Sequence, residues 1–479
     1  MQSSSASHLR VVLALLASFW AFHVHADTES PTSEELRQRN RETVARLFEE
    51  RQKEYAGNPG ALVRPGLVAL REGGSGRVEI DAETTGVEKN AIVEFLLIGE
   101  GSGHDYEALY VSLASASHID EALRFLGMKP GRNAYAKPMD FWPKGEHVMV
   151  SLKGVDGAAD IPLERLVLDR RDGAAEGATL PVRGFVYCGS RPAAPDPARQ
   201  EKDAIAADYD GPCSVLSTYN EPTTLLDVPR KASQNEVYES FLANPAPGHK
   251  AGDLVTLVLA PEPRAESEGT RVADLALRLD GTPDGARCLL AKADGTEIAR
   301  DAELATVLKD LSSKADRFDQ FVTLDWADSL TFRDAAATAA LLDGADTENG
   351  IRIEAPRENQ PYYRAFLPDP AWLDRAKRPT QPLELRFAKD DSGALAATLV
   401  SVVEIWPEDG SSLDPDIKAT DIPVPSVEAL PALADKTANE IPALLVYAPA
   451  SATLGEVLPF VRTLQKTRPN VYFFVETAK

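Results

Sequence analysis

Two stretches in the second half of the chain follow the same pattern: FVTLDWADSLTFRDAAATAALL at residues 321–342 and ALLVYAPASATLGEVLPFVRTL at residues 443–464. Each begins with an apolar run typical of a buried strand, continues through a polar turn, and then places apolar residues at helical spacing. Another short apolar run follows each stretch, at residues 350–354 and 471–475. The pattern therefore predicts two strand–helix–strand units.

The polar turns of the two stretches also match, because Ser329 and Thr331 of the first correspond to Ser451 and Thr453 of the second. Each threonine is followed three residues later by an acidic residue, which is the spacing of a helix capping box. Two explanations remain open. The units are either copies of one ancestral unit or independent units that share the pattern of any βαβ segment.

Around these stretches we expect a first unit over residues 272–358 and a second over residues 420–479. The segment between them, residues 359–419, contains two strand-like runs on either side of a turn-forming Asp-Ser-Gly, at residues 383–388 and 394–405. We expect this segment to form a connecting hairpin.

The first half of the chain predicts one α+β domain over residues 61–243, with short apolar strands and a helix near residues 117–126. Residues 244–271 are rich in proline and glycine around one short strand, and we interpret them as a linker. The fold class expected for the whole chain is α+β, with several domains, mixed sheets and short helices.

A charged helix is expected before this domain, within residues 27–60. Thr32 and Glu35 have capping-box spacing, and apolar residues recur along residues 31–55 at helical spacing in a narrow stripe. Such a helix lies either on the body of the protein or on a partner.

Residues 1–26 have the pattern of a secretory signal peptide. A polar start with Arg10 leads into an apolar run at residues 11–22, and the small residues Val24 and Ala26 suit signal peptidase. A helix of that length spans about 18 Å, less than the roughly 30 Å of a bilayer core. We therefore expect cleavage and a periplasmic or secreted protein with no later transmembrane helix. An uncleaved anchor is the alternative.

Acidic residues outnumber basic ones by 74 to 51, giving a formal net charge of −23. Such a surface repels phosphate backbones, so nucleic acid is not expected as a partner. The sequence contains no Gly-x-Ser-x-Gly elbow, no GxxxxGK phosphate loop and no HExxH zinc motif. We therefore expect no cofactor, and the sequence favours a protein that is not an enzyme while leaving that question open.

One group of residues would support a metal site or catalysis. His104, Glu107 and His118 carry imidazole and carboxylate groups of the kind that bind metals. Strand residues three apart face opposite sides, so both His104 and Glu107 reach one ion only if His104 lies in a turn before the strand. The alternative is that these groups make structural hydrogen bonds.

The chain has three cysteines, Cys188, Cys213 and Cys288, and an exported protein can form disulfides. A Cys188–Cys213 bridge would stabilise the folded protein by about 3 kcal/mol, because it closes a loop in the unfolded chain. The alternative is that all three are buried thiols.

Residues 372–378, with the sequence WLDRAKR, form a locally basic segment for which we expect a short helix. This segment would contact either an acidic partner or carboxylates of the chain itself, and internal pairing is the favoured interpretation.

A family resemblance lies in two stretches of the first domain: VEFLLIGEGSGHDYEALYVSLASASHIDEALRFLGMKPG at residues 93–131, and GFVYCGSRP followed by AADYDGPCSVLSTYNEPTTLLDVP within residues 184–229. In order and spacing they resemble the YdjY family of exported bacterial proteins. The resemblance covers more than a third of the chain and implies a fold and an envelope location, but no reaction. Cys188 and Cys213 depart from the polar residues expected in that family, which favours a bridge between them.

Residues 272–355 resemble the periplasmic part of the ExbD/TolR family, through LALRLDG, CLLAKADGTEIARDAELATVLKDL and the first quoted stretch; residues 420–477 would be a second copy. That family carries a membrane helix with an acidic residue for proton coupling, which is not found in this sequence. The resemblance therefore implies binding of cell-wall polymer or envelope proteins rather than a stator role.

Together these patterns favour an exported cell-envelope protein with a non-catalytic binding or scaffold role in the periplasm. The alternative is a metal-binding protein or an enzyme that uses His104, Glu107 and His118.

Overall fold

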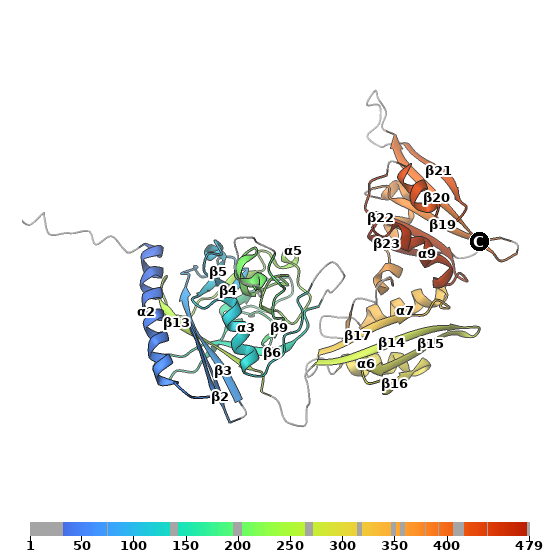
Figure 1. Ribbon diagram of the computed structural model, residues 1–479. Helices are drawn as coiled ribbons and strands as arrows, with labels where there is room; N and C mark the ends of the chain where they lie inside the picture. Colours follow the sequence, from blue (N-terminus) through green and yellow to red (C-terminus); the bar gives the residue numbers. More distant parts are fainter. Residues whose placement is uncertain are drawn as a thin grey trace, which may run out of the picture.

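The computed structural model describes residues 32–476, apart from residues 74, 135–141, 195–203, 264–271, 314–318, 346–350, 355–359, 379, 391, 406–415 and 438. The predicted signal peptide lies outside this range. Helices and mixed sheets occur along the chain, which confirms the α+β class. Figure 1 shows a first domain that carries α2 and a second body built from two smaller sheets.

An eleven-stranded sheet forms the frame of the first domain, in the order β1-β2-β3-β13-β6-β9-β11-β10-β4-β5, with β7 paired to β6. Because β5 also pairs with β3, the path from β3 to β5 closes into a ring. The strands are β1 (Ala61–Arg64), β2 (Leu67–Glu72), β3 (Ser75–Thr84), β4 (Phe95–Gly99), β5 (Ala108–Ser112), β6 (Glu146–Leu152), β7 (Ile161–Pro162), β9 (Phe185–Tyr187), β10 (Ser214–Ser217), β11 (Leu226–Asp227) and β13 (Leu254–Pro261).

The strand β13 lies inside residues 244–271, which the sequence pattern predicts as a linker. It pairs with β3 on one side and with β6 on the other, and its Leu257 and Leu259 are fully buried. The first domain therefore extends to Pro261, and the linker prediction is wrong for this strand. Its partners are distant in the sequence, so no local pattern reveals the pairing.

Short helices cover parts of this sheet. Ser115 caps α3 (Ala116–Phe125), where its hydroxyl accepts from the backbone N–H of His118, and Ile119 and Leu123 of the helix are fully buried. The other short elements are α4 (Ala206–Tyr209), α5 (Gln234–Val237), η1 (Asp105–Glu107), η2 (Leu163–Leu166), and the strands β8 (Val167–Asp169) and β12 (Phe241–Ala243), which pair separately.

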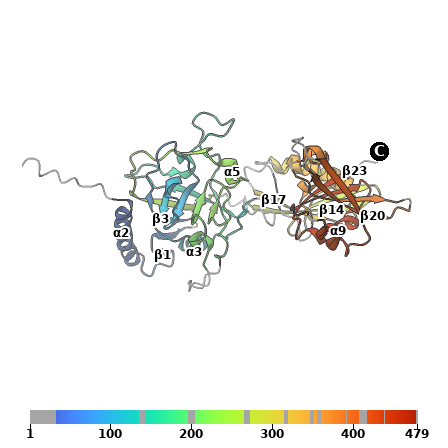
Figure 2. The ribbon, with the colours of Figure 1, turned by 90° about the horizontal axis from the view of Figure 1, so that it is seen from above.

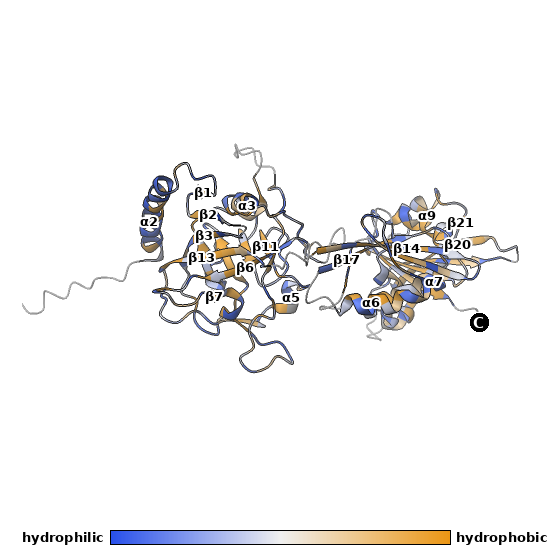
Figure 3. Cartoon of the chain, turned by 90° about the horizontal axis from the view of Figure 1, so that it is seen from below, coloured by the Kyte–Doolittle hydropathy of each residue, from blue (hydrophilic) through white to orange (hydrophobic). Residues whose placement is uncertain are grey.

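The predicted charged helix is α2 (Ser33–Glu54), and its capping box forms between Thr32 and Glu35. The helix lies on the side of the first domain away from the second body (Figure 2), and most of its surface is hydrophilic (Figure 3). Arg51 donates to both carboxylate oxygens of buried Asp81 on β3, at 2.6 and 2.9 Å. The helix therefore packs on the body of the protein, and ion pairs contribute much of the contact.

Two five-stranded sheets with one topology form the second body, in the orders β16-β15-β14-β17-β18 and β21-β20-β19-β22-β23. In each unit three antiparallel strands precede helix, parallel strand, helix and parallel strand. The first unit comprises β14 (Val272–Thr282), β15 (Gly285–Lys292), β16 (Glu297–Arg300), η4 (Asp301–Glu303), α6 (Leu304–Ser312), β17 (Asp319–Trp326), α7 (Phe332–Ala345) and β18 (Arg352–Ile353). The second comprises β19 (Leu383–Lys389), β20 (Leu395–Ile405), β21 (Asp416–Val424), α8 (Leu430–Asp435), β22 (Ala443–Pro449), α9 (Leu454–Leu464) and β23 (Asn470–Glu476), and η5 (Tyr363–Phe366), η6 (Pro370–Leu373) and η7 (Arg375–Lys377) lie between the units.

The central parallel strand pairs of the two units also share their register. Leu275 of β14 lies opposite Val322 of β17, and Leu383 of β19 lies opposite Leu444 of β22, which is the residue equivalent to Val322. The hairpin β19–β20 is therefore the first element of the second unit. The prediction of a separate connecting hairpin over residues 359–419 is wrong on this point, because β19 pairs with β22 and not only with β20.

The two units pack together through equivalent turns. Thr331 and Thr453 form an antiparallel bridge, and the backbone N–H of Phe332 donates to the carbonyl of Ala452 at 2.8 Å. Phe332 also meets Phe473 of β23 edge-to-face, with ring centroids 5.5 Å apart. Equivalent residues thus face one another, as at the axis of a twofold dimer, and one apolar core spans both units.

The first unit contacts the first domain through a network of charged side chains. His147 of β6 lies 2.6 Å from Asp319 of β17, through Nε2 and Oδ2, and Arg352 of β18 donates to the other oxygen of Asp319 at 2.6 Å. Arg132 of the first domain donates to Glu354 at 2.5 Å. The His147–Asp319 and Arg132–Glu354 contacts join the two bodies across the predicted linker, and the Arg352–Asp319 pair lies within the first unit.

The locally basic segment, residues 372–378, folds as parts of η6 and η7 and lies on the sheet of the second unit. Arg375 and Arg378 both donate to Glu384 of β19, whose side chain is fully buried. This confirms the prediction of internal pairing. The helical part consists of 3-10 turns rather than one α-helix.

In the part of the chain that the structure describes, no helix combines the length and apolar character needed to span a membrane.

Candidate functional site

His104 and Glu107, two of the three residues predicted as a metal or catalytic group, lie together. His104 directly precedes η1, so it occupies the turn before β5 that the sequence argument required. Its Nδ1 lies 2.6 Å from Oε1 of Glu107. The pair is partly exposed, with 37% of the His104 side chain and 13% of the Glu107 side chain accessible.

His118 does not join them. It lies on α3, where Asp208 is a charged neighbour. The carboxylate of Asp208 accepts from the backbone N–H of Ser117 at 3.1 Å. Among the described residues, no group of three His, Cys, Asp or Glu side chains could hold a metal ion. The predicted three-residue metal site is therefore wrong, because the helix places His118 in a different part of the domain.

Glu94 joins His104 and Glu107 instead. It directly precedes β4, is only 5% exposed, and its backbone N–H donates to the carbonyl of Glu107 at 3.0 Å. Gln234 of α5 donates to its Oε2 at 2.7 Å. Burial raises the pKa of Glu94, and the nearby charge of Glu107 raises it further. A signal was present in the sequence, since Glu94 is the one charged residue in the apolar run at residues 91–98.

Aromatic side chains surround this group. The ring of Phe95 meets those of His104 and Tyr219, with centroids 5.7 and 5.9 Å apart. Tyr106 is 70% exposed and Tyr238 is 52% exposed. The negative charge of Glu107 raises the pKa of the Tyr106 hydroxyl, and Tyr238 is close enough to contribute.

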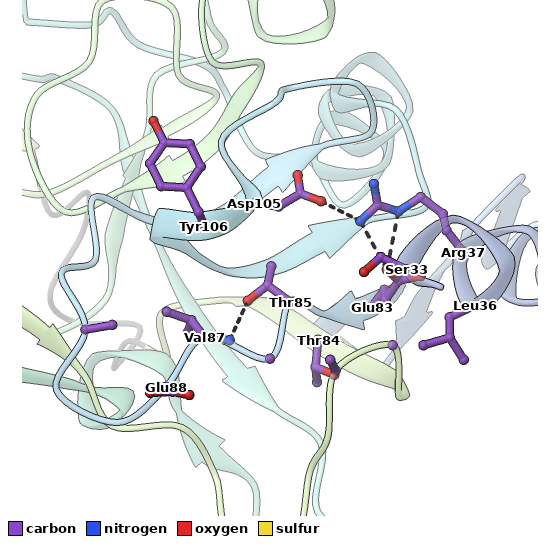
Figure 4. A pocket seen from close by; sticks show the side chains of 14 residues that line it. Ser33, Leu36, Arg37, Glu83, Thr84, Thr85, Val87, Glu88, Asp105 and Tyr106 are labelled. Carbon is purple, nitrogen blue, oxygen red and sulfur yellow. Dashed lines mark hydrogen bonds and ion pairs between the residues drawn. The ribbon is translucent and has the colours of Figure 1, made fainter. Parts of the chain in front are cut away.

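A pocket of about 530 Å³ lies on the other side of η1, between α2 and the closed sheet (Figure 4). Arg37 of α2 reaches into it and donates to Glu83 of β3 at 3.1 Å and to Asp105 of η1 at 2.7 Å. Tyr106 lies at the side of the pocket away from Arg37, and Glu88 lies near its lower edge in this view. The full lining is Ser33, Leu36, Arg37, Glu83, Thr84, Thr85, Gly86, Val87, Glu88, Ala91, Asp105, Tyr106, Ala251 and Gly252.

The short helix η1 connects the pocket with the His104–Glu107 pair. Its three residues point to different places: Asp105 bonds Arg37 at the pocket, Tyr106 is exposed, and Glu107 bonds His104. We call the pocket together with His104, Glu107 and Glu94 the η1 site. A ligand that lies over Tyr106 would contact both parts.

The predicted bridge between Cys188 and Cys213 is absent, because all three cysteines are free thiols and these two are buried. The backbone N–H of Cys188 donates to the carbonyl of Leu225. The backbone N–H of Leu225 donates in turn to the carbonyl of Ser214, the residue after Cys213. A whole strand thus separates the two cysteines, about 10 Å at the usual strand spacing. A disulfide needs Cα atoms within about 7 Å.

No family model, curated protein or solved structure matches the chain.

Proposed function

We propose that this protein is exported to the cell envelope, periplasmic or secreted, and acts there as a binding or scaffold protein. The observation that carries the proposal is the pocket between α2 and the closed sheet. Its volume of about 530 Å³ lies within the usual range for ligand sites of 300–1,000 Å³. The signal-like pattern at residues 1–26 and the resemblance to exported YdjY-like proteins support the location.

The lining of the pocket suits recognition of a polar ligand. Arg37 bonds both Glu83 and Asp105, so these charged side chains are already fixed in place before any ligand arrives. Charged groups held in this way bind with less loss of side-chain entropy. Cell-wall polymer or an envelope protein, the partners that the ExbD/TolR-like resemblance implies, would supply such ligands.

The tandem units support the scaffold part of the proposal. They pack into one body with a shared core, and the His147–Asp319 and Arg132–Glu354 contacts join the first unit to the η1-bearing domain. A ligand on the first domain and a protein partner on the tandem units would then be held at a set separation.

Cosedimentation with isolated cell wall tests the binding function. Ala251 is exposed at the pocket rim, so Ala251→Trp fills the pocket without disturbing the core. We expect wild-type protein to sediment with the wall, and Ala251→Trp to lose at least tenfold in affinity. The control Ala174→Trp changes an exposed loop of the same domain and should bind as wild type. Wild-type protein that stays in the supernatant would contradict the cell-wall role.

A second function is favoured by the His104–Glu107 pair. The Glu107 carboxylate bonds Nδ1 of His104 and so orients the imidazole. The neighbouring Glu94 has a raised pKa and can deliver a proton, so His104 and Glu94 together could act as base and acid. Screening the purified mature protein for cleavage of cell-wall fragments separates the two functions. Product that wild type releases and Glu107→Ala does not would favour the enzymatic role over the binding and scaffold role.

A further inference from the structure

The charge of the η1 site favours a cationic ligand. Among the described residues that line the pocket, Arg37 is the only cation, while Glu83, Glu88 and Asp105 are acidic. The guanidinium of Arg37 is shared between two of these carboxylates, so its charge is already balanced. Glu107 adds another carboxylate beside Tyr106. An approaching ammonium group is attracted by this excess of negative charge, and an anion is repelled.

The exposed tyrosines suit a ligand with a flat apolar face. Tyr106 and Tyr238 are the two most exposed tyrosines among the described residues, at 70% and 52%. A tyrosine ring attracts a cation over its face and also accepts the C–H face of a sugar ring. Tyr106 offers both attractions to a ligand, and Glu107 lies close to its hydroxyl.

The carboxylate of Glu107 is held in place before binding. Its Oε1 bonds Nδ1 of His104, and the His104 ring packs against Phe95. Glu94 lies behind this pair and is fixed by Gln234. A carboxylate fixed in this way can receive an ammonium or hydroxyl group without first losing rotational freedom.

We propose that the η1 site binds an amino-sugar unit of an envelope polysaccharide, with the sugar ring over Tyr106 and its ammonium group at Glu107. This inference rests on the proposed binding function and names its ligand class. A lysine side chain would satisfy the carboxylates equally well, but it has no ring face to cover Tyr106. The exposed tyrosines therefore favour the sugar.

Calorimetric titration with three short probes tests the assignment: a glucosamine tetramer, an N-acetylglucosamine tetramer and trilysine. The glucosamine tetramer should bind at least tenfold more tightly than either of the others. Tyr106→Ala should weaken its binding tenfold or more, and because this side chain is exposed the fold should be unaffected. Glu107→Gln should weaken binding of the glucosamine tetramer and reduce the preference over the acetylated tetramer.

The matched control is Tyr209→Ala, which removes a 44% exposed tyrosine on α4 of the same domain. It should bind the glucosamine tetramer as wild type does. Equal binding of the two tetramers, tighter binding of trilysine, or unchanged affinity in Tyr106→Ala would overturn the assignment. If wild-type protein sediments with cell wall but does not bind the glucosamine tetramer, the ligand class is wrong while the binding function stands.

Discussion

At the scale of single residues, Glu384 shows how one buried carboxylate holds a segment of chain on a sheet. Arg375 donates two hydrogen bonds to it, at 2.8 and 2.7 Å, and Arg378 and Arg386 donate one each, at 2.7 and 2.9 Å. Burial opposes the charge of Glu384, but the three guanidinium groups outweigh it and lower the pKa to about 2. The carboxylate therefore stays ionised and binds the basic segment to the second unit.

Replacing this carboxylate should destabilise the second unit. Glu384→Gln leaves buried Arg378 without a counter-charge, and the lowered pKa corresponds to about 3 kcal/mol at neutral pH. Thermal unfolding at pH 7 measures the loss. Glu297→Gln is the control, since Glu297 pairs with Arg300 in an exposed position on β16 and its replacement should change little. Equal melting temperatures for the two variants would contradict the role of Glu384.

The ionised Glu384 also predicts how the stability of the second unit changes in acid. In the folded protein the pKa of Glu384 is about 2, below its ordinary value of 4.5. Its contribution to stability is therefore fully present above pH 4.5 and is lost as pH falls from 4.5 toward 2. Melting curves recorded through this window should show a smaller acid-dependent loss for Glu384→Gln than for wild type. A parallel loss in both proteins would show that other carboxylates control acid unfolding.

The thiols give a prediction that separates the two interpretations of the cysteines. All three cysteines are free, and burial raises the pKa of the Cys188 and Cys213 thiols. The thiolate is the reactive form, so both should react slowly in the folded protein. In denaturant without reductant, a thiol reagent should titrate three groups per chain. One group would indicate that a Cys188–Cys213 bridge exists.

At the scale of elements, α2 packs on the first domain with few apolar contacts. Within the part of the chain described, only Asn40 and Val44 of the helix are buried. Asn40 donates to Glu83 at 2.8 Å and to the carbonyl of Gly252 at 2.9 Å, so the helix bridges β3 and the turn before β13. These polar contacts also form one wall of the pocket, which links the position of α2 to ligand binding.

Removing one cation of this helix should loosen it. Arg51→Ala leaves Asp81 buried and without its bidentate partner, a change that typically costs about 3 kcal/mol. Hydrogen exchange of the α2 amides should then become faster. Arg46→Ala, which removes an exposed pair with Glu50 at 3.9 Å, should leave the exchange rates unchanged. Exchange of the α2 amides as slow in Arg51→Ala as in wild type would mean that other contacts hold the helix.

At the scale of the whole molecule, the two tandem units differ in what covers the sheet face opposite their helices. Leu275, Leu277 and Leu279 of β14 face the helices, so the alternate residues of the strand face the other side. On that side the first unit contacts the first domain, through Asp319 and Glu354. The equivalent face of the second unit is covered by the segment that holds Glu384.

The contact between bodies should depend on Asp319. Asp319→Asn keeps the shape of the side chain but weakens its contact with buried His147 of the first domain, so we expect a loss of about 2 kcal/mol in docking. The change also removes the counter-charge of Arg352 within the first unit. Small-angle scattering should show a larger radius of gyration or a broader distribution of shapes. The control Asp280→Asn alters an exposed pair with Arg278 and should scatter as wild type. An unchanged profile in Asp319→Asn would show that the other contacts between the bodies, such as Arg132 with Glu354, suffice.

The sequence by itself determined the elements whose signals are local. The capping boxes at Thr32 and Thr453 form as predicted, and so does the threonine–aspartate cap at Thr331. Each depends on residues three positions apart and on backbone groups beside them, so the chain needs no distant partner to specify them. The repeated strand–helix–strand pattern, the α+β class and the pairing of His104 with Glu107 were predictable for the same reason.

Only the tertiary structure decided what depends on distant pairing. It placed β13 between β3 and β6, joined β19 to β22, and put a strand between Cys188 and Cys213. It also brought Glu94 to His104 and carried His118 away. Strand partners are selected by burial and register over the whole domain, and this information is not contained in any short window of residues.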